Sequence, residues 1–147
     1  MVLSPVPGTV VPITEVDDPV FADAMVGPGI AVRPVGGHHD AVTPIDGTVA
    51  TLHPHAFVVA GDDGRAVLVH LGIDTVKQEG AGFTVHVAKG DTVRAGQPMV
   101  GWDPDAVAAA GYSAIVPVVA LDASADVLSE LRSGEIASGE GLFTWEG

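Results

Sequence analysis

The histidines at positions 55 and 70 are the side chains whose spacing first suggests chemistry. Two apolar arms, 56–60 and 65–69, enclose a Gly-Asp-Asp-Gly segment, which predicts a β-hairpin. If the loop is centred between the two aspartates, His55 and His70 lie directly opposite each other, with Cβ atoms about 4.5–5.5 Å apart. A register shifted by two keeps them diagonal neighbours, whereas a shift of one puts the rings on opposite faces of the hairpin.

Two facing imidazoles support a short list of reactions. A neutral ring nitrogen can act as a nucleophile while the second ring donates a hydrogen bond to the group that becomes attached. The pair could instead bind an adventitious or interface zinc ion, or have no chemical role. The chain has no cysteine, which excludes disulfides, thiolate zinc sites and cysteine nucleophiles.

The other four histidines carry weaker signals. His53 lies two residues before His55 and would share its face on a strand, a pairing for which a native metal role is not favoured. His38 and His39 are expected in a solvated loop. His86, between two valines, is expected to be an exposed strand residue.

The elements that must position these side chains are short strands. Nineteen glycines and eleven prolines punctuate Val-rich runs, a pattern typical of an all-β antiparallel sandwich or barrel. No linker interrupts the chain, so a single domain over residues 1–147 is expected. The predicted strands cover residues 8–13, 30–34, 47–52, 56–59, 66–71, 83–87 and 115–119.

Two segments predict one or two short helices. Asp103 can cap a helix that continues to Ala110 and ends at Gly111. Ser124 can cap a second helix that ends before Gly134. One face of this second helix would carry three apolar residues: Val127, Leu128 and Leu131.

An internal echo suggests a duplication. Residues 4–10 (Ser-Pro-Val-Pro-Gly-Thr-Val) resemble residues 43–49 (Thr-Pro-Ile-Asp-Gly-Thr-Val), at an offset of 39. Each copy combines a Pro-anchored turn, a glycine and a strand, which favours a pseudo-duplicated sandwich.

The excess of acidic residues excludes some classes of function. Six basic and nineteen acidic residues give a formal charge of −13 with a pI near 4.4, and 47% of residues are apolar. Such a chain can form a packed core but should repel nucleic acid. The first basic residue is Arg33, so no signal peptide is expected, and no apolar run reaches the ~18 residues of a membrane span. A soluble cytoplasmic protein without membrane insertion is expected.

Residues 64–76 (Gly-Arg-Ala-Val-Leu-Val-His-Leu-Gly-Ile-Asp-Thr-Val) resemble the active-site signature of the glucose-type IIA components (EIIA-Glc family) of the bacterial phosphoenolpyruvate-dependent sugar phosphotransferase system. The resemblance covers nearly the whole chain and implies an antiparallel sandwich of the duplicated hybrid type. Further motifs follow in the family's order at residues 18–22, 26–31, 41–49, 55–57, 79–83, 89–91 and 117–119.

This resemblance implies a histidine phosphocarrier, a phosphotransferase that requires no cofactor. His70 would accept a phosphoryl group from phospho-HPr and pass it to the cysteine of an EIIB domain in a membrane EIIBC permease, during uptake of glucose or N-acetylglucosamine. His55 would hydrogen-bond the bound phosphoryl group. The unphosphorylated form could also bind regulatory targets.

The resemblance also implies a partner-binding surface. Asp74 and Asp18 match carboxylates that meet basic residues of HPr. The family often has a threonine two residues before the second histidine; here His53 occupies that position, and either its ring or the backbone would orient His55. The apolar interface positions are matched by Val20, Phe21, Val26, Leu68 and Val69.

Three other functions remain open on the residues alone. A lipoyl- or biotinyl-type carrier needs a modified lysine in a Met-Lys-Met-like turn, which neither Lys77 nor Lys89 offers. A purely regulatory binding protein would use the same surface without transferring phosphate. A zinc metallopeptidase on a related sandwich would use spacings found here in reverse order, at His53, His55, His70 and Asp74.

Overall fold

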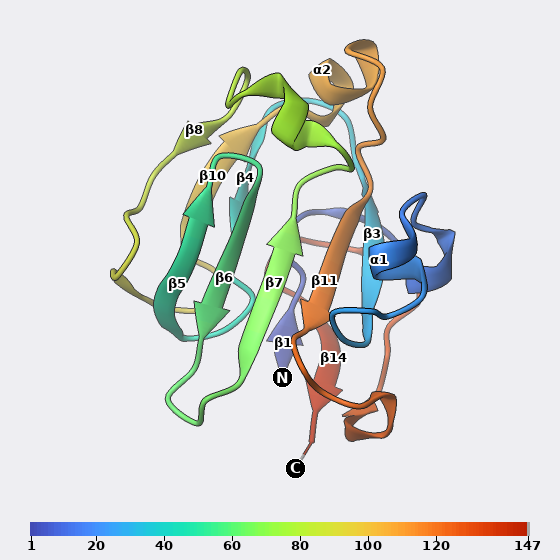
Figure 1. Cartoon of the computed structure of the whole chain (residues 1–147), viewed down its shortest axis with the longest axis vertical. Coiled ribbons are helices and arrows are strands. Elements are labelled where there is room, and N and C mark those ends of the chain that lie inside the picture. Colours follow the sequence, from blue (N-terminus) through green and yellow to red (C-terminus); the bar gives the residue numbers. More distant parts are fainter. Residues whose placement is uncertain (147) are drawn as a thin grey trace.

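The computed structural model describes residues 1–146, whose strands form antiparallel sheets packed face to face (Figure 1). The largest sheet has eight strands, which are, in spatial order, β13 (Gly134–Ile136), β2 (Gly8–Pro12), β3 (Gly29–Pro34), β11 (Val116–Ala120), β7 (Ala66–His70), β6 (Ala56–Ala60), β5 (Gly47–His53) and β9 (Thr92–Val93).

Two smaller sheets, each of three strands, complete the sandwich. One contains β1 (Val2–Leu3), β14 (Gly141–Trp145) and β12 (Leu128–Ser129), and the other β4 (His39–Val42), β10 (Pro98–Trp102) and β8 (Thr84–Val85). The helical segments are short: α1 (Pro19–Ala22), α2 (Pro104–Ala109) and the 3-10 turns η1 (Ile13–Glu15), η2 (Thr75–Gln78) and η3 (Ala125–Val127).

Both faces of the eight-stranded sheet carry an apolar core. In β7, Val67 and Val69 are fully buried in the main core, which includes Trp102 of the opposing sheet. Leu68 points to the other face and packs into a second core around Phe21 of α1, because side chains alternate along a strand. α1 therefore covers the outer face of β3 and β11 (Figure 1).

The echo in the sequence corresponds to a structural duplication. The backbone N–H of Leu3 donates to the carbonyl of Pro44 at 2.9 Å, and that of Val42 donates to Pro5 at 2.9 Å. Residues 39 positions apart thus exchange roles, as an approximate two-fold axis requires. The strand registers repeat the relation, pairing Leu3 with Gly141 as Val42 with Pro98, and Gly8 with Ile136 as Gly47 with Val93.

The predicted all-β antiparallel sandwich is confirmed, and each of the seven predicted runs contains a strand. The predicted helix after Asp103 is confirmed as α2, and the Asp103 carboxylate accepts a hydrogen bond from the Asp105 N–H at 2.9 Å. Gly111, just after α2, has a φ of 94°, which glycine adopts without strain.

The second predicted helix is wrong beyond one turn. η3 is a single 3-10 turn in which the Ser124 side chain makes no capping hydrogen bond. Leu128 instead enters β12 and pairs with Trp145 of β14. The partner strand lies far along the chain, so the local pattern of apolar residues did not reveal the pairing.

Candidate functional site

The rings of His55 and His70 meet, although not through the predicted register. Their centroids lie 5.1 Å apart in an edge-to-face arrangement, with 69° between the planes. The residue opposite His70 in the β6–β7 ladder is Ala56 and not His55. The register therefore differs by one residue from the prediction, a shift expected to separate the two rings.

The turn between β6 and β7 explains the shifted register. The Gly61 N–H donates to the Arg65 carbonyl at 2.8 Å, so the loop proper has an odd number of residues, centred on Asp63. Gly64 adopts a φ of 85°, the left-handed conformation that closes three-residue hairpin loops. The prediction considered only loops centred between two residues.

The rings still meet because His55 does not lie in a strand. His53 pairs with Ala56, so Pro54 and His55 form the two-residue turn between β5 and β6. The His55 carbonyl accepts a hydrogen bond from the Leu71 N–H at 2.7 Å. This bond fixes the turn beside the residue that follows His70, and a turn position is not bound to the alternation of a strand.

The His70 ring is held in one tautomer. Its Nδ1 atom is hydrogen-bonded to the Gly72 carbonyl, and a carbonyl oxygen can only accept. The proton of the neutral ring therefore lies on Nδ1, which leaves the lone pair on Nε2. Burial lowers the pKa of His70, against an opposing contribution from the Gly72 hydrogen bond. The ring is thus neutral, and Nε2 is nucleophilic.

The loop after β7 presents the Gly72 carbonyl. Gly72 has a φ of 83°, and the flanking backbone is tied down on both sides. The buried Thr75 hydroxyl donates to the Leu71 carbonyl at 2.9 Å, and the Ile73 N–H donates to the Ser113 carbonyl at 2.9 Å. The acceptor for Nδ1 is therefore part of a rigid loop.

We expect Gly72→Ala to destabilise the fold by about 2–4 kcal/mol, because strained φ and steric overlap add. A Cβ there would lie 2.8 Å from the Ser113 carbonyl oxygen and 2.7 Å from Thr75 Cγ2. Gly111→Ala is the matched control, since Gly111 also has a positive φ but nothing within 4 Å. Urea denaturation measures both, and equal losses would contradict the packing argument.

The His55 ring is also neutral at neutral pH. Partial burial, followed by the charges of His70 and His53, lowers the pKa of His55 to about 4. A neutral imidazole keeps one N–H donor, so the ring can donate to an attached anionic group. Two neutral rings side by side also avoid the repulsion that two imidazolium ions would suffer.

An NMR titration should show the His55 resonances moving with a midpoint near pH 4, and His70→Ala should raise this midpoint by removing a neighbouring ring. In the unfolded chain, His55 takes up a proton near pH 6.5. The stability contributed by neutral His55 is therefore fully present above that pH. It is lost as the pH falls toward 4, by at most about 1 kcal/mol for a half-exposed ring. A midpoint near 6.5 would contradict the assigned environment.

The Phe21 ring covers part of the His70 ring. The two ring centroids are 5.4 Å apart, tilted by 56°, and Phe21 is 6% exposed. α1 brings it there, capped at its N-terminus by Asp18, whose carboxylate accepts from the Val20 N–H at 3.0 Å. Phe21 thus shields one side of the nucleophile and contributes little surface to a partner.

The two predicted partner-facing carboxylates lie near His70. Asp18 and Asp74 both act to raise its pKa through their charges, which places both carboxylates within electrostatic range of the ring. Asp74 is exposed, has a φ of 61° and makes no capping hydrogen bond with η2. Its side chain is therefore directed to the surface and does not stabilise the loop.

The apolar candidates divide by exposure. Val20 is 39% exposed, and Val26 and Leu68 are partly buried. Val69 is fully buried in the main core, so its predicted contact with a partner is wrong; its position in β7 turns it away from the surface. Two further apolar side chains, Met25 and Val76, are 69% and 59% exposed, and no motif in the sequence singled them out.

Among the remaining histidines, His39 corrects an expectation. It lies in β4, partly buried, with its ring 5.7 Å from that of Trp102, and not in a solvated loop. His38 is exposed, as expected. His86 is exposed just after β8 and pairs with Asp40 at 2.9 Å.

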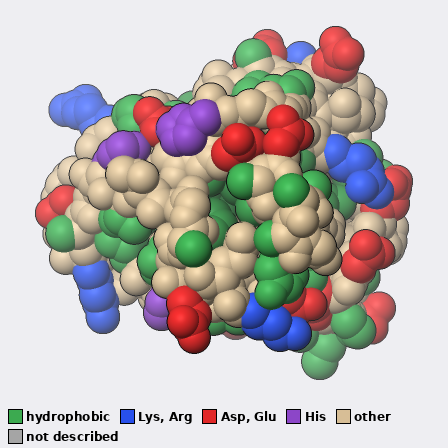
Figure 2. Space-filling model, turned by 90° about the horizontal axis from the view of Figure 1, so that it is seen from above, with side chains coloured by type: hydrophobic (Ala, Val, Ile, Leu, Met, Phe, Trp, Pro, Cys, Tyr) green, Lys and Arg blue, Asp and Glu red, His purple; other side chains and the backbone are tan. Residues whose placement is uncertain are grey.

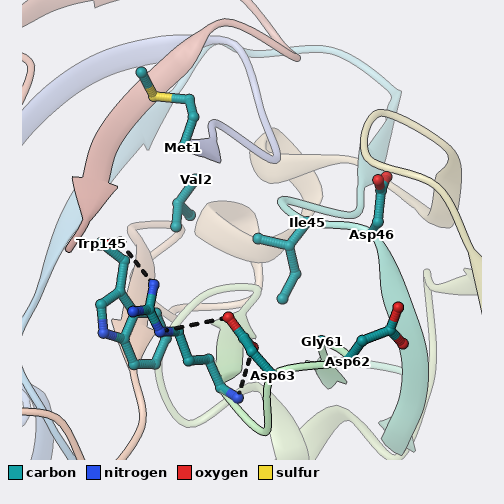
Figure 3. A pocket seen from close by; sticks show the side chains of 9 residues that line it. Met1, Val2, Ile45, Asp46, Gly61, Asp62, Asp63 and Trp145 are labelled. Carbon is teal, nitrogen blue, oxygen red and sulfur yellow. Dashed lines mark hydrogen bonds and ion pairs between the residues drawn. The ribbon is translucent and has the colours of Figure 1, made fainter. Parts of the chain in front are cut away.

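The hollow in Figure 3 lies away from the histidines. It encloses about 320 Å³ between the start of β1, the β6–β7 turn and the end of β14. The Arg65 guanidinium donates to the Trp145 carbonyl at 2.7 Å and lies 5.3 Å from the centroid of that indole ring. The histidine pair itself is at the opposite end of β6 and β7, where the arrow of β7 ends in Figure 1. Figure 2 looks onto this end of the molecule, where histidine, acidic and apolar side chains are all exposed.

A β-sandwich that presents a neutral histidine of fixed tautomer beside a second neutral histidine defines a protein that can carry a transferable group on a ring nitrogen. The chain belongs to the family described as phosphoenolpyruvate-dependent sugar phosphotransferase system, EIIA 1, whose model matches residues 1–125. The predicted family is thereby confirmed, and with it a phosphocarrier of this transport system.

Individual relatives agree with this family assignment. The glucose-specific EIIA component of Oceanobacillus iheyensis is 35% identical over 144 residues, covering 95% of this chain and 85% of that protein. The glucose permease IIA of Mycoplasma capricolum superposes with a TM-score of 0.92 at 32% identity, covering 99% of this chain and 94% of the other.

Other relatives are much longer. The β-glucoside-specific EIIBCA component of Bacillus subtilis is 37% identical over 143 residues, which are 95% of this chain but 23% of that protein. The glucose-specific EIICBA component of Streptococcus pneumoniae is 48% identical over 114 residues, 76% of this chain and 15% of that protein. The chain corresponds to one part of these multidomain proteins.

The alternative functions gain no support from these findings. Within residues 1–146, no group of three histidine, aspartate or glutamate side chains is arranged to hold a metal ion, and the relatives are phosphotransferase components and not peptidases. Among the helices of the described chain, none has the length and apolar character needed to cross a bilayer.

Proposed function

We propose that this protein accepts a phosphoryl group from phospho-HPr on His70 Nε2 and passes it to the cysteine of an EIIB domain of a permease for glucose or a related hexose such as N-acetylglucosamine. The observation that carries the proposal is the hydrogen bond between His70 Nδ1 and the Gly72 carbonyl, which leaves Nε2 unprotonated. Family membership supports the acceptor, because relatives join EIIA and EIIB in one chain.

In the first step, the Nε2 lone pair of His70 attacks the phosphorus atom of phospho-HPr. The bond between phosphorus and the histidine nitrogen of HPr breaks, and its electron pair returns to that nitrogen. The proton stays on His70 Nδ1 and remains hydrogen-bonded to the Gly72 carbonyl, so the ring spreads the developing positive charge without rotating. No cofactor is needed, because the donor is already an activated phosphoramidate.

In the second step, the thiolate of the EIIB cysteine attacks the same phosphorus atom. The Nε2–phosphorus bond breaks, and its electrons return to the His70 ring as the lone pair. We propose that His55 donates a hydrogen bond to the phosphoryl oxygens, since its neutral ring lies edge-to-face against His70. Stabilising a phosphoryl group in transfer is chiefly positioning and charge compensation.

The surroundings suit two successive protein partners. Val20, Met25 and Val76 expose apolar side chains on the segments that carry Asp18 and Asp74, and these two carboxylates supply negative charge near His70. An apolar patch with charged residues at its edge favours docking of a basic partner and excludes water from the phosphohistidine. The unphosphorylated surface could also bind regulatory targets through the same residues.

The test is reconstitution with phosphoenolpyruvate, enzyme I and HPr. We expect one phosphoryl group per chain, labile in acid and stable in base as a phosphohistidine is, and its loss to the cysteine when an EIIB domain is added. Absence of labelling, or labelling that EIIB cannot discharge, would overturn the proposal.

We expect Asp74→Asn to raise the KM for phospho-HPr about 3- to 5-fold at low ionic strength, with kcat little changed, because the carboxylate steers a basic partner. Asparagine tolerates the left-handed backbone of this position. Asp62→Asn, an equal change of charge at the exposed β6–β7 turn, is the matched control. The two variants should converge at 0.5 M salt, and an effect that persists there would contradict steering.

A further inference from the structure

The His55 ring has few neighbours that could set its orientation. Its backbone is fixed by the Pro54 turn and by the hydrogen bond from Leu71. Among the hydrogen bonds found in residues 1–146, none involves the His55 ring nitrogens. The aromatic neighbours are His70, edge-on at 5.1 Å, and His53, nearly parallel at 5.6 Å with 24° between planes.

We propose that His53 is a positioning residue that holds the His55 ring by parallel stacking in the orientation that serves the phosphoryl group on His70. The inference rests on the proposed function and deepens it. Phe21, His70, His55 and His53 then form one continuous row of four rings, in which the reacting ring is second and His53 is the outer end.

The reaction itself makes the outer contact important. When His70 is phosphorylated, the group on Nε2 changes what the His55 ring meets on that side. The stack with His53 is the contact that can stay constant through both half-reactions. A side chain that is already held by a neighbour has less rotamer freedom to lose when it forms a hydrogen bond. The entropic cost of forming that bond is therefore smaller, and its net free energy is more favourable.

His53 is suited to this role by its backbone. It is the last residue of β5, it pairs with Ala56, and Pro54 follows it directly. Proline fixes its own φ near −65° and restricts the residue before it to extended conformations. The side chains that flank Pro54 are therefore presented side by side, and two planar rings at these positions can stack.

The test compares three variants in single-turnover transfer from the phosphorylated protein to an EIIB domain. We expect His53→Ala to slow transfer at saturating EIIB about 3- to 10-fold, the size of one lost aromatic contact, without changing the EIIB concentration for half-maximal rate. His53→Phe, which keeps a ring but has no nitrogen, should restore the rate. His38→Ala, at another exposed histidine, should behave like the wild type.

A second readout does not depend on transfer. In NMR relaxation experiments on the unphosphorylated protein, the His55 ring should be more mobile in His53→Ala and as ordered as the wild type in His53→Phe. A wild-type rate and an ordered His55 ring in His53→Ala would overturn the inference while leaving the proposed function intact. Loss of rate in His53→Phe as well would show that the nitrogen atoms of His53 act, and not its stacking. Failure of the wild type to accept phosphate would instead overturn the proposed function.

Discussion

His70→Ala should take up no phosphoryl group from phospho-HPr, whereas the wild-type chain takes up one. The variant removes the ring whose tautomer the Gly72 carbonyl fixes and whose free Nε2 lone pair is the proposed nucleophile. Because the nucleophile itself is lost, the expected effect is complete and not a change in rate. Labelling with radioactive phosphoenolpyruvate in the presence of enzyme I and HPr measures it.

His70→Gln separates loss of the nucleophile from loss of the fold. Its amide N–H can still donate to the Gly72 carbonyl, so the loop should keep its shape, and the thermal unfolding midpoint should stay close to that of the wild type. His86→Ala, which changes an exposed histidine paired with Asp40, should be labelled fully. Normal labelling of either His70 variant would show that another residue carries the phosphoryl group.

His55→Gln should accept the phosphoryl group but pass it on slowly. The ring lies beside His70 without being the nucleophile, so its contribution belongs to stabilising the phosphoryl group in transfer. Glutamine keeps an amide N–H but lacks the rigid ring that places the donor, and losing one positioned hydrogen-bond donor costs on the order of 10²-fold in rate. Rapid-quench measurement of transfer from the phosphorylated variant to an EIIB domain isolates this step from the uptake step.

The control is His38→Gln, the same substitution at an exposed histidine outside the row of rings. It should leave both steps unchanged. If His55→Gln slows uptake and discharge equally, the residue stabilises both reactions, and its proposed role in onward transfer is too narrow. Unchanged discharge would remove His55 from the site.

The strands were predictable because turn residues mark their ends. Glycine and proline separate the Val-rich runs, and the alternation of Val67, Leu68 and Val69 between two cores follows from strand geometry. The signature around His70 predicted the family without any structure. The echo between residues 4–10 and 43–49 predicted the duplication. The structure agrees, because the two copies make equivalent backbone hydrogen bonds.

What the sequence left out depends on contacts between distant segments. The burial of His39 comes from Trp102 in a strand that lies about 60 residues further along. The β6–β7 register depends on whether the loop closes with an odd or even number of residues, which Gly64 decides through its left-handed φ. The contact of His55 with His70 was predicted, but through the wrong geometry, because a turn and a strand present a side chain differently.

The hydrogen bond and ring contact of Arg65 with Trp145 bear on how this domain can be joined to other domains. They tie the β6–β7 turn to the last strand, and Met1 and the end of β14 both lie beside that turn (Figure 1). His70 lies at the other end of β7, about 14 Å away along the strand. A tether at either terminus would therefore leave the histidine surface open while raising the effective concentration of a joined partner. This geometry is compatible with both kinds of relative, the short EIIA component and the longer EIIBCA and EIICBA components.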